Sequence, residues 1–157
     1  MSTIILETLI NAKPEVCYKL SLNVNLHQTS TSKTGEYIVD GVKEGVMKLG
    51  DSVTWRAKHF GIWQNLTTTI TEEKPFTYFV DEMQEGAFKS MKHEHYFLKN
   101  GDKTTMKDVF IFTSPFGIIG KIFNHLILEN YMKNFLIERN KMIKEVAESE
   151  KWQQFMR

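Results

Sequence analysis

Six short candidate strands follow one another along the middle of the chain, and one helical pattern takes over after them. The strands are expected at 37–48, 51–60, 64–72, 76–84, 88–98 and 104–113. Short turn-like separators divide them, among them Gly50-Asp51, Lys74-Pro75 and Asn100-Gly101. Because parallel neighbours need a crossover of about a dozen residues, connections this short predict antiparallel hairpins.

After Ser114-Pro115 the period changes, and apolar residues recur at steps of three, four or seven as far as about Ala147. This spacing predicts one amphipathic helix. About 30 residues at ~1.5 Å each give roughly 45 Å of helix, enough to cross the whole sheet. The same stripe could serve a coiled coil, but its Phe, Tyr and Met residues suit an uneven sheet surface better. A curved sheet with one long helix across it predicts an enclosed space between the two.

The N-terminal part adds one more strand and two short helices. Residues 3–10 are expected to form the strand, and Pro14 suits the first turn of a short helix after it. A second helix is expected near 22–30. Residues 1–147 are expected to form a single domain, and 148–157 a C-terminal extension that either lengthens the helix or contacts another subunit.

Composition narrows the functional classes. The chain has 157 residues, which favours one domain, and a net charge of +1 without any Lys/Arg run longer than two, which argues against a nucleic-acid partner. No stretch approaches the ~20 apolar residues of a membrane span, and the N-terminus lacks the pattern of a signal peptide. The lone Cys17 cannot form an internal disulfide, so a cytoplasmic location is expected. We expect a monomer or a homodimer.

Charged residues predict which face of each strand points inward. In 51–60, Thr54, Arg56 and Lys58 share one face, so the inner face is expected to hold Val53, Trp55, Ala57 and His59. A two-residue turn within Phe60–Trp63 would pair Ala57 with Leu66. Strand 76–84 stays ambiguous: a two-residue Glu85-Gly86 turn sends Asp81 outward, and a bulged turn sends it inward.

The last hairpin brings polar residues to the inner face. Lys92, Glu94 and Lys107 mark the outer face, so the inner face is expected to hold Met91, His93, His95, Phe97, Met106, Asp108, Phe110 and Phe112. A two-residue Asn100-Gly101 turn would pair Lys99 with Asp102 and set His93 directly opposite Asp108. Directly opposed side chains have Cβ atoms about 5 Å apart, close enough for a hydrogen bond.

Several of these segments resemble the SRPBCC superfamily, the START-like and birch-pollen-allergen-like helix-grip group, and most of all its small bacterial ligand-binding members. They are Leu49–Gly61, Gly86–Phe88, His93–His95, Thr104–Asp108 and Ser114–Gly117. The resemblance implies an α+β helix-grip fold, in which a seven-stranded curved antiparallel sheet wraps around a long C-terminal helix and two short helices close one end. It also implies a small hydrophobic molecule in the space between. Neither an iron-ligand set nor a Rieske cysteine pattern is present in the sequence, so no cofactor is expected.

The sequence therefore predicts a protein that binds or carries a small hydrophobic or amphipathic molecule. Polar contacts are expected from His59, His93, His95 and Asp108, and apolar walls from Trp55, Met91, Phe97, Met106, Phe110, Phe123 and Tyr131. An alternative is a cyclase- or hydrolase-type enzyme with His93 and Asp108 as a general base pair. His93, His95 and Asp108 could also chelate a metal, but no metal is expected. A third alternative is an interaction module whose own side chains fill the interior.

Overall fold

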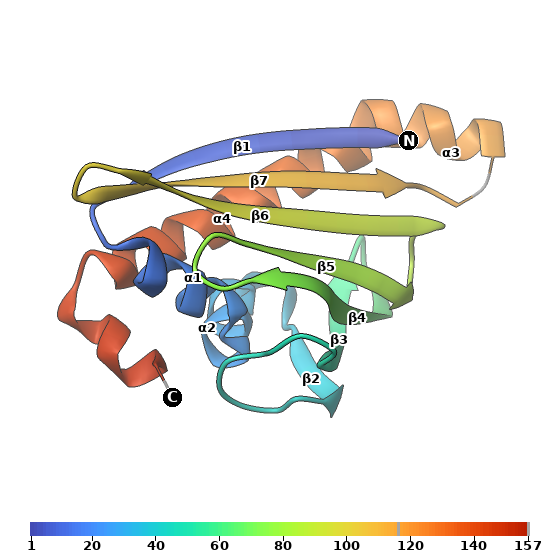
Figure 1. Cartoon of the computed structure of the whole chain (residues 1–157). Helices are drawn as coiled ribbons and strands as arrows, with labels where there is room; N and C mark the ends of the chain where they lie inside the picture. The colour runs from blue at the N-terminus through green and yellow to red at the C-terminus, as the bar shows by residue number, and fades with distance from the viewer. Residues whose placement is uncertain (116, 157) are drawn as a thin grey trace.

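The seven strands form one antiparallel sheet in the order β1-β7-β6-β5-β4-β3-β2 (Figure 1). The computed structural model describes residues 1–115 and 117–156, with side chains other than those of Lys121 and Asn124. The strands are β1 (Ser2–Ile10), β2 (Tyr37–Gly41), β3 (Ser52–His59), β4 (Ile62–Lys74), β5 (Tyr78–Glu85), β6 (Ser90–Asn100) and β7 (Lys103–Thr113). The expected antiparallel hairpins are confirmed. Phe116, within the Ser114–Gly117 segment of the resemblance, lies outside the described residues.

Two short helices follow β1 as expected: α1 (Pro14–Leu22) begins at the proline, and α2 (Val24–Ser30) follows directly. The Asn23 side chain accepts a hydrogen bond from the Leu26 backbone N–H at 2.9 Å and so caps α2. A short 3-10 turn, η1 (Ser32–Thr34), leads into β2. Both helices lie close to the C-terminal helix in Figure 1, and their apolar side chains join one buried core.

The expected long C-terminal helix is confirmed and runs without a gap from Gly117 to Ala147, but its geometry changes along its length. It consists of α3 (Gly117–Phe123), the π-helical turn η2 (Asn124–Leu128) and α4 (Glu129–Ala147). A π turn inserts extra chain into the helix and rotates the residues before it relative to those after it. Only α4 crosses the face of the sheet (Figure 1).

The expected apolar stripe therefore divides in two. In α4 it packs inward through Leu136, Ile143 and Val146, which are all buried. In α3 and η2 most apolar side chains are exposed rather than packed on the sheet, which corrects the expectation for Ile119, Ile122, Phe123 and Leu126. Ile118 and Ile127 are exposed as well, whereas Leu128 is buried. Among the described residues, no helix is long and apolar enough to cross a membrane.

In two hairpins, each residue lies opposite a partner two residues away from the expected one. The turn between β6 and β7 is closed by Asn100 and Lys103, so His95 lies opposite Asp108 and His93 opposite Phe110. The turn between β3 and β4 is closed by His59 and Ile62, which sets Trp55 opposite Leu66. Both shifts are of two residues, and the pleat repeats every two residues, so each side chain keeps its expected face.

Strand β2 ends at Gly41, before the expected limit of residue 48. Gly41 has a φ of 82°, and a Cβ atom there would lie 2.2 Å from the Ser52 carbonyl oxygen. Only glycine fits such a close approach to the neighbouring strand. The chain then leaves the sheet and returns at β3.

The C-terminal extension turns back onto the domain. Residues Glu150–Phe155 form a 3-10 helix, η3. The Asn23 amide donates a hydrogen bond to the Phe155 carbonyl oxygen at 3.0 Å, and Trp152 packs against the core. Within this structure the extension therefore contacts its own chain, although the proposed domain boundary at residue 147 stays a prediction.

Candidate functional site

A cavity of about 1340 Å³ lies between the inner face of the sheet and the C-terminal helices. Eight of the eleven expected binding residues line it: Trp55, His59, Met91, His93, His95, Phe110, Phe123 and Tyr131. The other three, Phe97, Met106 and Asp108, face inward but do not belong to its wall. They lie in the packed layer behind it, so their expected contact with a ligand is not supported by the geometry.

Aromatic side chains gather at the outer end of the cavity. The His59 Nδ1 and Tyr131 hydroxyl are 2.7 Å apart and link the end of β3 to the start of α4. The centroid of the Phe60 ring lies 4.6 Å from that of Tyr131 and 5.7 Å from that of Phe123. Phe60 has a φ of 51°, which is uncommon for a bulky residue. These partly exposed residues form the mouth of the cavity.

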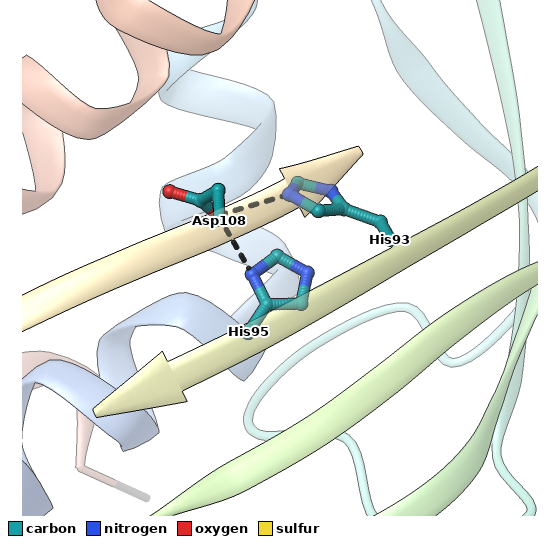
Figure 2. Close-up of side chains that lie close together, drawn as sticks. All are labelled: His93, His95 and Asp108. Carbon is teal, nitrogen blue, oxygen red and sulfur yellow. Dashed lines mark hydrogen bonds and ion pairs between the residues drawn. The ribbon is translucent and has the colours of Figure 1, made fainter. Parts of the chain in front are cut away.

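The inner end is polar. Figure 2 shows the His93 and His95 rings projecting from β6 toward Asp108 on β7. His93 Nε2 and Asp108 Oδ1 form a hydrogen bond of 2.9 Å, and His95 Nδ1 lies 3.0 Å from the same oxygen in a less well aligned contact. Although His93 and Asp108 are diagonal rather than directly opposed, the two residues of the expected pair do meet. We call His93, His95 and Asp108 the floor cluster.

Two residues of α4, Arg139 and Asn140, contact the floor cluster through Asp108. The Asn140 amide donates to Asp108 Oδ2 at 2.6 Å. Arg139 Nη1 lies 3.5 Å from Asp108 Oδ1, and the same nitrogen donates to the side-chain Oδ1 of Asn140 at 3.0 Å. Both oxygens of the buried carboxylate therefore have partners, as a buried charge requires.

These contacts set the charges of the floor cluster. Burial alone would raise the pKa of Asp108, but the hydrogen bonds from His93 and His95 outweigh it and hold that pKa well below its ordinary value. Desolvation lowers the pKa of His95 far below its usual range, and the neighbouring His93 ring, 3.7 Å away between centroids, adds to that effect. At neutral pH the structure thus contains an ionised Asp108 beside a neutral His95.

The floor cluster has the donor types of a metal site, with three ligand atoms within 4.8 Å of one another. The residues around the floor cluster, however, make the binding of a metal cation unfavourable. The Arg139 guanidinium already lies beside Asp108 Oδ1, and Asn140 occupies Oδ2. A metal ion would have to share one carboxylate with a buried positive charge. The chemistry of the donor set therefore favours hydrogen bonding over metal chelation.

Asp81 is the carboxylate that the sequence left undecided, and it faces the cavity. The two-residue Glu85-Gly86 turn is not formed, because β5 ends at Glu85 and β6 begins only at Ser90, and both Phe79 and Asp81 point inward. Asp81 lies opposite His93 on the neighbouring strand. Its Oδ1 is buried and has no hydrogen-bond partner. Desolvation raises the pKa of Asp81, against the nearby charge of His93 and the Thr68 hydroxyl.

Replacing Asp81 by asparagine is expected to leave the ligand-free protein as stable as the wild type or to stabilise it by about 1 kcal/mol, because the change removes a carboxylate that desolvation disfavours and whose Oδ1 has no hydrogen-bond partner. Urea unfolding at pH 8 would measure the effect. Glu82→Gln, at the next position of the same strand, is the control and should change little. A clear loss of stability in Asp81→Asn would contradict this reading of the carboxylate.

Sequence reasoning missed two polar residues at or behind this end of the cavity, Arg139 and Asn140, and left the face of Asp81 undecided. A signal for the two missed residues was available. Arg139 and Asn140 fall three and four residues after Leu136, on the buried stripe of α4, where polar residues need partners. A partly buried contact of 2.8 Å between His27 Nε2 and Glu36 Oε1 also borders the cavity and was not expected.

Comparison with known proteins identifies the fold: it is the helix-grip fold of START-like and birch-pollen-allergen-like proteins. A protein from Thermus thermophilus is 17% identical with a TM-score of 0.76 over 93% of this chain and 97% of that chain. A START superfamily protein from Mycobacterium smegmatis is 10% identical with a TM-score of 0.70, and the major latex-like protein 151 of Panax ginseng is 15% identical with a TM-score of 0.64; each pair covers 93% of this chain and 97% of the other. No family model and no curated protein matches the sequence.

Proposed function

We propose that this protein binds or carries a small hydrophobic or amphipathic molecule in the cavity between the sheet and the C-terminal helices. The observation that carries the proposal is the division of the cavity wall. Its outer part is aromatic and aliphatic, and its inner end presents His93, His95, Asp81 and Arg139. A ligand would bury its apolar body along the first part and place its polar end at the second. Structural likeness to START-like proteins supports hydrophobic ligand binding in general.

Native mass spectrometry of the purified protein, followed by solvent extraction, tests the proposal directly. We expect a co-purified small molecule, or uptake of one from a library of lipids, sterols and aromatic compounds. A protein that emerges empty and takes up nothing from the library would contradict the proposal.

Filling the cavity should weaken binding without unfolding the protein. Ala57 is buried on the cavity wall, so the ring in Ala57→Phe would occupy the space of a ligand. We expect the affinity for the neutral probe N-phenyl-1-naphthylamine to fall by about tenfold or more, equivalent to ~1.4 kcal/mol, as followed by probe fluorescence. Lys58→Phe is the matched control, because Lys58 is exposed on the outer face of the same strand. Equal loss in both variants would place the probe outside the cavity.

The floor cluster supports a second candidate, a cyclase- or hydrolase-type enzyme with His93 as general base. The supporting observation is the 2.9 Å contact with Asp108, which orients the imidazole as catalytic histidines usually are oriented. A His93→Ala variant that keeps ligand affinity and loses conversion would favour the enzyme. Loss of affinity without any conversion in the wild type would favour the carrier.

We also propose that the protein works in the cytoplasm, as a monomer or homodimer, without a nucleic-acid partner. The free and buried Cys17 and the net charge of +1 support this setting. Burial raises the pKa of the Cys17 thiol to about 11, so the thiol stays protonated and unreactive.

A further inference from the structure

Resting on the proposed function, we infer that the cavity selects ligands whose polar end donates hydrogen bonds, an amine or a hydroxyl group, and that Asp81 is the residue that receives it. The inference names the chemical class of the ligand, which the shape of the cavity alone does not determine.

The tautomer of His95 supplies the first step of the argument. Its Nδ1 faces the ionised Asp108 at 3.0 Å, where a lone pair would be repelled and an N–H is attracted. A neutral imidazole that carries its proton on Nδ1 has a lone pair on Nε2. The Nε2 atom lies on the side of the ring away from Asp108 (Figure 2), so His95 presents an acceptor there.

Arg139 does not reverse this preference, although it is a cation on the cavity wall. Its guanidinium lies against Asp108, the side-chain Oδ1 of Asn140 and the Ser21 backbone carbonyl, at 3.5, 3.0 and 3.5 Å. Asp108 therefore balances its charge. The excess acceptor capacity at the inner end is the Asp81 carboxylate, whose Oδ1 is buried without a hydrogen-bond partner.

An unpaired buried acceptor on a cavity wall favours a ligand that brings a donor. An ammonium group would bring a positive charge as well as hydrogen-bond donors to Oδ1 of Asp81, and a hydroxyl group would supply one hydrogen bond. A carboxylate would place its own lone pairs and negative charge against Asp81. The inner end therefore favours amines and alcohols and rejects acids of the same size.

Four probes that share one ring system test this selectivity: 2-naphthalenemethanamine, 2-naphthalenemethanol, 2-methylnaphthalene and 2-naphthoate. Calorimetry or naphthalene fluorescence at pH 7.5 would measure their affinities for the ligand-free protein. We expect the amine and the alcohol to bind more tightly than the methyl compound, and the carboxylate to bind most weakly. In Asp81→Asn the affinity for the amine should fall about tenfold or more, with the methyl compound unchanged. Glu82→Gln is the control and should behave as the wild type.

The outcomes separate this inference from the proposed function. Equal binding of all four probes, or tightest binding of the carboxylate, would overturn the selectivity for donors and leave the cavity as a binding site. A loss of amine affinity in Asp81→Asn that the methyl compound shares equally would also overturn it. If none of the probes binds, including the methyl compound, both the proposed function and this inference fail for ligands of this size.

Discussion

Replacing Asp108 by leucine is expected to lower the free energy of unfolding by 3 to 5 kcal/mol, taken as about the loss seen when one partner of a buried ion pair is removed. Asp108 is fully buried, and its carboxylate receives contacts from His93, His95, Arg139 and Asn140. The leucine would leave a buried guanidinium and two ring N–H groups without their acceptor. Urea unfolding at pH 7.5, with the slope compared between variants, would measure the loss.

Asp81→Leu is the matched control, because Asp81 on β5 and Asp108 on β7 are both inward carboxylates beside the β6 histidines but have different hydrogen-bond partners. Asp108 has partners for both oxygens, whereas Oδ1 of Asp81 has none. Leucine at position 81 should therefore cost far less stability than leucine at position 108. Similar losses at the two positions would mean that volume, rather than charge pairing, determines the stability of this end of the cavity.

Acidification is expected to destabilise the protein in two stages, and the first is assigned to His95. Its pKa is lowered in the folded state, so below pH 6.5 the unfolded chain binds a proton that the folded protein excludes. Stability then falls as the pH falls, with a slope approaching about 1.4 kcal/mol per pH unit for that one proton. His59, whose pKa desolvation also lowers, adds to this stage.

The second stage is assigned to Asp108. Its folded pKa lies well below the ordinary value of 3.8, so its contribution is complete above that value and is lost as the pH falls through the folded pKa. Asp81 acts in the opposite direction, because its raised pKa makes protonation favour the folded state.

Unfolding free energies at pH 8, 6.5 and 5 would test the first stage. His95→Leu should flatten the decline between pH 6.5 and 5, after its own loss of stability at pH 8 is subtracted. His125→Leu, which changes an exposed histidine in η2, should leave the slope as it is in the wild type. An unchanged slope in His95→Leu would assign the acid sensitivity to another group.

The fold and the inward faces could be predicted because both depend on local patterns. Charge alternation along β6 and β7 identified each inward side chain, and a register error of two residues left that result unchanged. The predicted register of this hairpin was wrong, because the register depends on which residues occupy the turn. Gly101, with a φ of 62°, takes the first central position of the turn, where the expected turn had Asn100.

Tertiary contacts account for the other differences. The inward position of Asp81 follows from its pairing with the inward-facing His93, and the connection between β5 and β6 that sets this pairing is longer than a two-residue turn. Ile119 and Ile122 are exposed, and the helix takes π geometry at Asn124–Leu128, while the sequence pattern continues through that turn unchanged. Arg139 and Asn140 were missed because the stripe was followed through its apolar members only, although both positions lie on the same helix face.

The straight run of α4 along the cavity sets a length scale for what the cavity can hold. Tyr131 at the mouth and Arg139 at the inner end are eight positions apart on this helix, which corresponds to roughly 12 Å of axial rise. A ligand shorter than that span can contact only the mouth or the inner end of the cavity, and water would fill the rest of the cavity. Compounds that reach both ends at once should dissociate more slowly than shorter homologues with the same terminal group.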